Sequence, residues 1–200
     1  MRVKYGVFIE PTGALRDSVL MNKRTLQRAF PNAAYVGHPP HCTVIFGECV
    51  SPEHWVDGLR TTLKTNRGFE VETNAWQDFP ADPLTGGHTL AYRILKSPQL
   101  AALQLRVARF LAPHMRPSES PHPLAETEPF ASSLRHYHSP FVGDHWIPHF
   151  TIGSPRADAD DPVLNAIRST SPLHQFTLRE VTIYRVDQDC HEVVDRIPLN

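Results

Sequence analysis

The chain has 200 residues, of which 40% are hydrophobic and 20% are charged, and its formal net charge is -1. This length and composition suit one globular domain, or two closely packed lobes, with a substantial core. The near-neutral charge argues against a protein that grips long nucleic acid, because such binding depends on neutralising many phosphates with Lys and Arg.

The cysteines and the first residues indicate the cellular setting. The chain has an odd number of cysteines without close spacing, which fits neither a disulfide framework nor a zinc site: Cys42, Cys49 and Cys190. The opening residues lack the pattern of a signal peptide, and no apolar run approaches the roughly 20 residues that cross a bilayer. We therefore expect a reduced, cytoplasmic protein that has no membrane segment.

The hydrophobic pattern predicts an alternation of strands and helices along the chain. Period-two alternation and β-rich composition predict strands at 3–10, 41–49, 69–78, 89–95 and 149–153, and a final hairpin at 176–187 and 190–199. Helical spacing, caps and prolines predict helices at 17–30, from Ser51 to about 66, from Ser97 onward, and at 160–169. The segment 113–148 is rich in Pro, Ser and His and is too long for an ordinary connection, which predicts an irregular binding loop, a lid or a disordered insert.

One short pattern occurs twice, as PHCTV at 40–44 and as PHFTI at 148–152. In a strand, residues i and i+2 point to the same face. His41 and Thr43 therefore share one face, and His149 and Thr151 share another. The residues between them turn the opposite way and can pack a core.

Two imidazoles and two hydroxyls that converge on one space suit a phosphodiester. One imidazole acts as general base toward the attacking oxygen, and the other, protonated, donates to the leaving oxygen. The threonine hydroxyls donate hydrogen bonds to the non-bridging oxygens, where negative charge builds up. This chemistry requires neither a metal nor another cofactor.

The paired motifs His41-Cys42-Thr43-Val44 and His149-Phe150-Thr151-Ile152 resemble those of the two-histidine phosphoesterase superfamily, which includes 2'-5' RNA ligase-like proteins and cyclic nucleotide phosphodiesterases. The resemblance covers nearly the whole chain, including YGVFIEP near the start and LREVTIYRVDQDCHEVVDRIPL at the end. It implies a single bilobal α+β domain over 1–200, in which two antiparallel sheets face each other across a central cleft with helices outside. It also implies metal-independent chemistry at a ribose 2' phosphoester, with catalytic residues His41, Thr43, His149 and Thr151.

Four further residues are candidates for substrate contact. Tyr5 and Phe8 lie on opposite faces of the first strand, and either one can stack on a base or simply pack in the core. Tyr184 lies mid-strand, Arg156 follows the second motif and can neutralise phosphate, and Tyr137 reaches the cleft if the 113–148 segment closes over it. The prediction therefore names Tyr5, Tyr137, Arg156 and Tyr184.

The 113–148 segment also carries several histidines. They offer a metal site or substrate contacts, but their spacing matches no known ligand pattern and acidic partners at helical spacing are absent. We therefore expect a solvated or partly ordered loop and no metal there. The histidines are His114, His122, His136, His138 and His145.

These observations predict a monomeric phosphodiesterase. Its expected partner is a nucleotide or short oligonucleotide with a 2',3'-cyclic phosphate or a 2'-5' bond. Two alternatives stay open: a module that binds a nucleotide or phosphorylated metabolite without turnover, and an enzyme that ligates or processes RNA through 2'-5' bonds.

Overall fold

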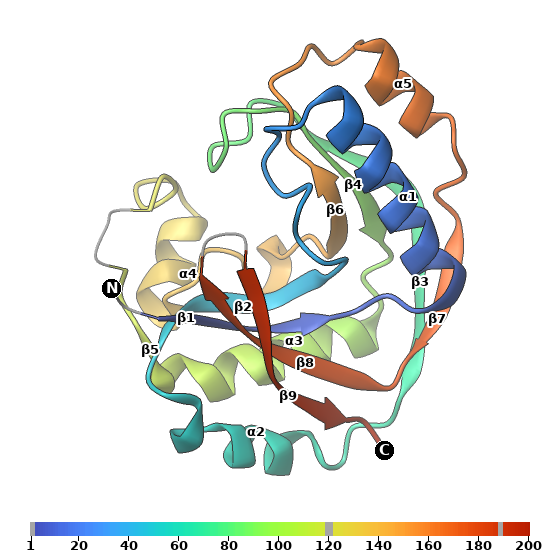
Figure 1. The fold of residues 1–200 in the computed structure, drawn as a ribbon. Helices are drawn as coiled ribbons and strands as arrows, with labels where there is room; N and C mark the ends of the chain where they lie inside the picture. The colour runs from blue at the N-terminus through green and yellow to red at the C-terminus, as the bar shows by residue number, and fades with distance from the viewer. Residues whose placement is uncertain (1–2, 119–121, 188–189) are drawn as a thin grey trace.

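Two antiparallel sheets form the framework of the protein (Figure 1). The computed structural model describes residues 3–118, 122–187 and 190–200. The first sheet has the strand order β5-β2-β1-β8-β9, and the second has the order β6-β4-β3-β7. The strands are β1 Lys4–Ile9, β2 Cys42–Cys49, β3 Phe69–Phe79, β4 Thr89–Ile94, β5 Met115–Arg116, β6 His149–Gly153, β7 His174–Leu178, β8 Glu180–Asp187 and β9 Cys190–Pro198.

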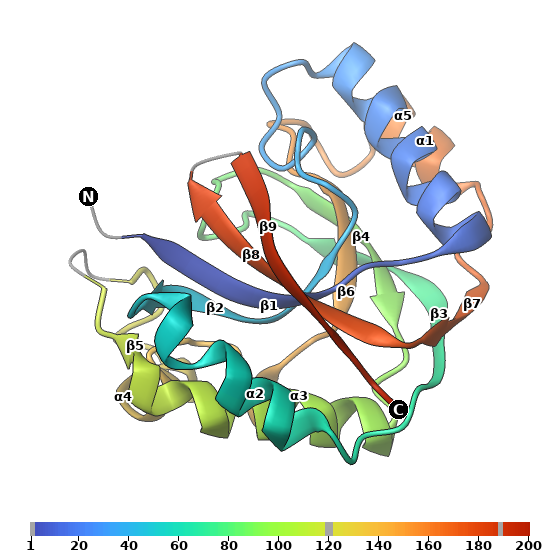
Figure 2. The same cartoon turned by 60° about the horizontal axis from the view of Figure 1, so that its bottom comes forward.

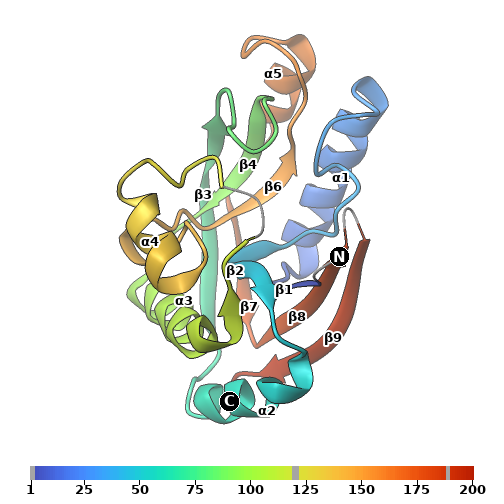
Figure 3. The same ribbon diagram turned by 90° about the vertical axis from the view of Figure 1, so that its left-hand side faces the viewer.

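Helices cover the two sheets separately. On the second sheet, α1 packs against β6 and β7 with α5 beside it, whereas α2 and α3 pack against β9 and β2 of the first sheet (Figure 2). The fourth helix, α4, lies against α3 (Figure 3). The helices are α1 Gly13–Ala29, α2 Val56–Leu63, α3 Pro98–Leu111, α4 Phe130–Tyr137 and α5 Pro162–Arg168, with short 3-10 turns at Pro52–His54, Ala112–His114 and Gly143–His145. The predicted α+β class with two antiparallel sheets is confirmed.

The connectivity exchanges hairpins between the two halves of the chain. The hairpin β3–β4 follows the first motif in sequence, yet it pairs with β6, which carries the second motif. The hairpin β8–β9 follows the second motif and pairs through β1 with β2, which carries the first. The sheet that contains each motif strand therefore includes a hairpin from the other half of the chain, and one hydrophobic cluster includes residues of both sheets.

Local sequence signals explain most element boundaries. The Ser97 hydroxyl caps α3 by accepting from the backbone N–H of Leu100 at 3.2 Å, as its place before Pro98 predicts. The helix expected from Ser51 begins later, at Val56. The intervening Trp55 is buried, and its Nε1 donates to the Val50 carbonyl at 3.1 Å, which accounts for a 3-10 turn in place of a first helical turn.

Two further expectations differ from the structure. The strand predicted at 176–187 is divided at Arg179, because β7 pairs with β3 in the second sheet while β8 pairs with β1 in the first. The segment 113–148 is less irregular than expected, since α4, β5 and two short 3-10 turns lie in or at its ends. Residues 119–121 of this segment lie outside the described part of the chain. Among the described residues, no helix combines the length and apolar character needed to cross a bilayer.

Candidate active site

The first motif opens strand β2 of the first sheet. His41 directly precedes the strand, Thr43 is exposed, and Cys42 and Val44 are buried at 1% exposure each. This is the alternation that the sequence predicts. Burial raises the pKa of the Cys42 thiol to about 12, so this cysteine is a protonated core residue and not a nucleophile.

The second motif forms β6, at the edge of the second sheet. Phe150 and Ile152 are fully buried, while His149 and Thr151 are half-buried on the other face. Strand β4 places Arg93 opposite His149 and Ala91 opposite Thr151. Residues directly opposite in an antiparallel pair point to the same face, so the exposed Arg93 extends from the same side of the sheet as His149.

Direct contacts hold the two motifs together. Trp146, just before the second motif, donates from Nε1 to the Thr43 carbonyl at 2.9 Å. Strands β2 and β6 are also in contact, and the backbone N–H of His149 opposes the rise that burial causes in the pKa of Cys42. A third link comes from α3, where Gln104 donates to the Val44 carbonyl at 3.2 Å and accepts from the Gly143 N–H at 3.1 Å. The chain segments that carry His41 and His149 are therefore adjacent.

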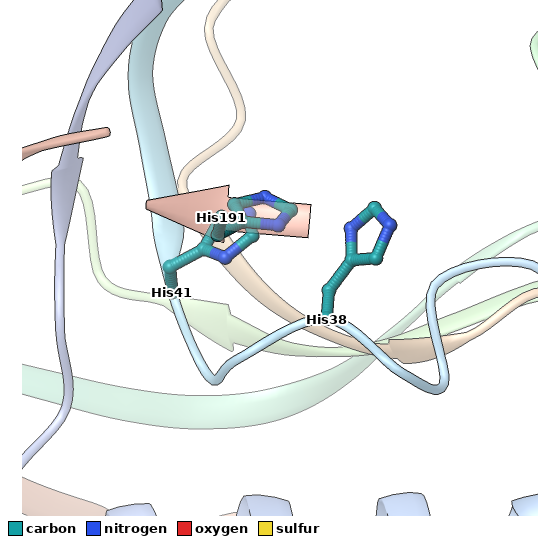
Figure 4. Close-up of side chains that lie close together, drawn as sticks. All are labelled: His38, His41 and His191. Carbon is teal, nitrogen blue, oxygen red and sulfur yellow. The ribbon is translucent and has the colours of Figure 1, made fainter. Parts of the chain in front are cut away.

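Aromatic rings surround His41. The Phe8 ring packs edge-on against it with ring centroids 4.8 Å apart, and His191 lies at 5.0 Å, His38 at 6.2 Å and Tyr184 at 6.5 Å. Gly6 makes room for this arrangement, since a Cβ at that position would lie 2.6 Å from the Phe8 ring. Figure 4 shows that His38, His41 and His191 point toward one another.

The His41 environment favours the neutral imidazole. Burial, then the nearby His191, Lys23 and His38, hold the pKa of His41 well below its usual range. Its Nδ1 atom is buried and has no hydrogen bond of good geometry within the described residues, and the weaker approach of the Pro39 carbonyl offsets this lowering only in part.

The His149 environment fixes the tautomer of that ring. Nδ1 lies 2.7 Å from the Ile147 carbonyl, which can only accept, so Nδ1 carries the proton and Nε2 is left for chemistry. The Phe79 ring packs at 5.1 Å. Burial lowers the pKa of His149, and the Ile147 hydrogen bond and the negative charge of Asp82 oppose that lowering.

The comparison with known proteins identifies the family. A sequence model of the 2'-5' RNA ligase superfamily matches residues 15–189. The chain belongs to this superfamily. No curated protein sequence matches it.

Solved structures of the two-histidine phosphoesterase fold are similar over nearly the full chain. The Thermus thermophilus protein TT0787 has 13% sequence identity and a TM-score of 0.64, covering 98% of this chain and 97% of its own. Escherichia coli LigT complexed with 3'-AMP has 14% identity and a TM-score of 0.60, covering 100% and 99%. Kluyveromyces marxianus Usb1 has 14% identity and a TM-score of 0.51, covering 98% of both chains. At these identities the similarity shows a shared fold.

Of the four residues predicted to contact substrate, only Tyr184 lies near His41 in the described structure. Tyr184 lies near His41, and its hydroxyl donates to Glu10. Tyr5 is turned toward Trp55, with ring centroids 6.3 Å apart, and Phe8 from the opposite face contacts His41 in its place. Tyr137 packs against the hydrophobic core. Arg156 is exposed beyond the end of β6.

Three residues near the candidate site are not singled out by the sequence analysis: Lys23, Arg93 and His191. Strand alternation could have indicated Arg93, because it follows the buried Tyr92 and therefore points to the opposite, exposed face. Helical spacing could have indicated Lys23, because it lies on the buried stripe of α1, four residues after Val19 and three before Leu26. Only 4% of it is exposed, and burial lowers its pKa to about 7 while Nζ donates to the Tyr35 and Ile152 carbonyls. No local pattern marks His191, because only the pairing of β8 with β9 brings it to His41.

Proposed function

We propose that the protein is a phosphodiesterase that hydrolyses a 2',3'-cyclic phosphate or a 2'-5' bond in a nucleotide or short oligonucleotide, with His41 and His149 as its acid–base pair. The observation that carries the proposal is the direct contact between the two motif segments, through the hydrogen bond from Trp146 Nε1 to the Thr43 carbonyl and the packing of β2 against β6. That contact makes neighbours of the two chain segments that carry His41 and His149, one from each sheet, which supports a shared site.

The proposed reaction is an in-line displacement at phosphorus. One imidazole removes a proton from water as its oxygen forms the new bond to phosphorus. The other imidazole, protonated, donates to the ribose oxygen as its bond to phosphorus breaks. The water proton thus ends on the base and the acid becomes neutral. The orientation of the bound substrate decides which histidine takes which role.

Electrostatic stabilisation of the pentavalent state comes from groups beside each histidine. The hydroxyls of Thr43 and Thr151 donate to the non-bridging oxygens, and Arg93, opposite His149 on β4, supplies positive charge to the bound phosphate. A bound phosphate also favours protonation of a nearby imidazole, which opposes the low pKa of His41 and His149. These groups form a site for one phosphodiester, in keeping with a net charge of only -1.

The relatives support a nucleotide as the substrate class. E. coli LigT has been solved with 3'-AMP, NADP+, ATP and phosphate. Because this chain has the same fold over its full length, we infer that a nucleotide phosphate binds between His41 and His149. Both motifs belong to one chain, so we also infer that the monomer is sufficient, which light scattering of the active enzyme tests.

Alanine substitution of each histidine tests the proposal. His41→Ala and His149→Ala should each lower kcat by about 10²–10⁴-fold against a panel of 2',3'-cyclic nucleotides and 2'-5'-linked dinucleotides. His136→Ala is the matched control, since His136 is exposed on α4 and its ring contacts only the local Ser132 carbonyl and Tyr137 in the described structure. Unchanged turnover in both motif variants ends the proposal.

RNA ligation is a second candidate, favoured by the superfamily to which the chain belongs. Ligation would use the same acid and base with a 5' hydroxyl in place of water: the 5' oxygen bonds to phosphorus as its proton goes to the base, and the bond from phosphorus to the 3' oxygen breaks as that oxygen takes the proton of the acid. Incubation with an RNA that ends in a 2',3'-cyclic phosphate and one with a free 5' hydroxyl distinguishes the directions. A joined 2'-5' product from the wild type, absent with His41→Ala, supports ligation. If wild type binds nucleotides but converts neither substrate, both catalytic functions fail and the non-catalytic binding module remains.

A further inference from the structure

Three histidines from separate parts of the chain meet at one point of the candidate site. His38 comes from the loop after α1, His41 from the entry to β2 and His191 from the start of β9. Each offers a ring nitrogen, and these three atoms all lie within 4.8 Å of one another (Figure 4). Acid–base catalysis at phosphorus uses only one of them, so the other two need a separate explanation.

The geometry lies close to that of a three-imidazole metal site. Zn–N bonds of about 2.0–2.1 Å at tetrahedral angles place the nitrogens about 3.4 Å apart. Separations of at most 4.8 Å require the rings to close by about 1.4 Å or less, within reach of side-chain rotation for half-buried rings. Among the described residues, neither a carboxylate nor a thiolate belongs to this cluster, so a bound ion keeps its charge and an open fourth position.

The surroundings of His41 suit a metal ligand. Its imidazole is neutral, and metals bind the neutral form. The Phe8 and Tyr184 rings supply an apolar shell on the same side of the sheet.

We propose that His38, His41 and His191 form a binding site for a divalent transition-metal ion, with Zn²⁺ as the best match, and that the bound ion inhibits the enzyme by withdrawing His41 from acid–base chemistry. Imidazole nitrogens suit Zn²⁺ and its neighbours and not Mg²⁺ or Ca²⁺, which prefer oxygen. The inhibitory half rests on the proposed function, whereas the binding half does not.

Titration of the metal-stripped full chain with Zn²⁺ against a chromogenic chelator tests binding. We expect one Zn²⁺ per chain, confirmed by native mass spectrometry. His38→Ala and His191→Ala should each weaken binding by more than the roughly 10–100-fold typical of losing an outer-sphere partner. His54→Ala is the control and should bind as wild type does, since His54 is exposed beyond β2 with Glu53 as its ion-pair partner.

Circular dichroism establishes whether the variants fold, and His38→Gln and His191→Gln replace any that do not. Failure of wild type to bind Zn²⁺, or equal binding by wild type and both cluster variants, overturns the site. Co²⁺ gives a second readout, because only ordered tetrahedral coordination produces its intense visible absorption.

Turnover measured with increasing Zn²⁺ tests inhibition. The half-inhibiting concentration should match the dissociation constant, a chelator should restore activity, and His191→Ala should raise both values by the same factor. Tight binding without loss of turnover overturns the inhibitory half. If the metal-stripped wild type has no phosphodiesterase activity, the proposed function fails, while the Zn²⁺ titration still decides the site.

Discussion

Replacing Trp146 with Phe tests whether the two motifs must be held together for catalysis. Trp146 is only 4% exposed, and its Nε1 is the side-chain donor that joins the second motif's entry to the Thr43 carbonyl at 2.9 Å. Phenylalanine keeps an aromatic ring but has no N–H. The substitution therefore releases Thr43 from the 146–149 segment while leaving the His and Thr side chains in place.

The expected loss of stability follows from one hydrogen bond and part of one ring. A lost hydrogen bond costs about 0.5–1.5 kcal/mol if water reaches the carbonyl, and about 1–3 kcal/mol if it does not. With the smaller ring the total is about 2–4 kcal/mol. For catalysis the shift matters more, since a displacement of about 1 Å can cost about 100-fold in rate. We expect kcat/KM to fall at least about tenfold, equivalent to about 1.4 kcal/mol of transition-state stabilisation.

Trp55→Phe supplies a matched control. Trp55 is 1% exposed and also donates from Nε1 to a backbone carbonyl, that of Val50 at 3.1 Å, at the far end of β2. Urea unfolding should show similar losses of stability for both variants. Steady-state kinetics should show the large loss of kcat/KM only for Trp146→Phe, with Trp55→Phe within about twofold of wild type. If both substitutions lower kcat/KM equally, the link between Trp146 and Thr43 is not specifically required for catalysis.

Three further predictions concern charge and packing around the site. Because the pKa values of both His41 and His149 are lowered, each ring loses its proton at a lower pH than a free imidazole does, and the protonated acid becomes scarce as pH rises. The value of kcat/KM should therefore peak below about pH 6.5 and fall toward pH 8; a flat or rising profile contradicts this. Folding lowers the pKa of Lys23 from 10.5 to about 7, so the unfolded chain binds more protons between these values and stability rises with pH there by up to about 1.4 kcal/mol per unit. Lys23→Met should flatten that slope in urea unfolding near pH 7.5 and 9.5, and an unchanged slope would show that Lys23 is not its source. Gly6→Ala places a Cβ 2.6 Å from the Phe8 ring, so it should cost about 1–3 kcal/mol of stability and shift the His41 ring resonances in NMR spectra; wild-type stability and spectra would show that Phe8 yields freely.

Most of the strands and helices, and the direction of the side chains on the motif strands, could be predicted from local sequence pattern. Alternation assigned His41 and Thr43 to one face and Cys42 and Val44 to the core, and burial agrees. The helix cap at Ser97 could also be predicted, because the backbone N–H that it accepts from, that of Leu100, lies only three residues away. The prediction that a helix begins at Ser51 was wrong, because a tertiary contact, the burial of Trp55, determines the backbone conformation there.

Local pattern is enough to predict that two His/Thr pairs lie on strands whose apolar residues turn inward, since side-chain direction in a strand repeats every two residues. Which strands are neighbours depends on the packing of the whole chain. The exchange of hairpins puts Arg93 opposite His149 in the sheet and the His191 ring near the His41 ring, and it divides β7 from β8 at Arg179. Strand pairing depends on contacts between residues far apart in the chain, and local periodicity contains no information about such partners.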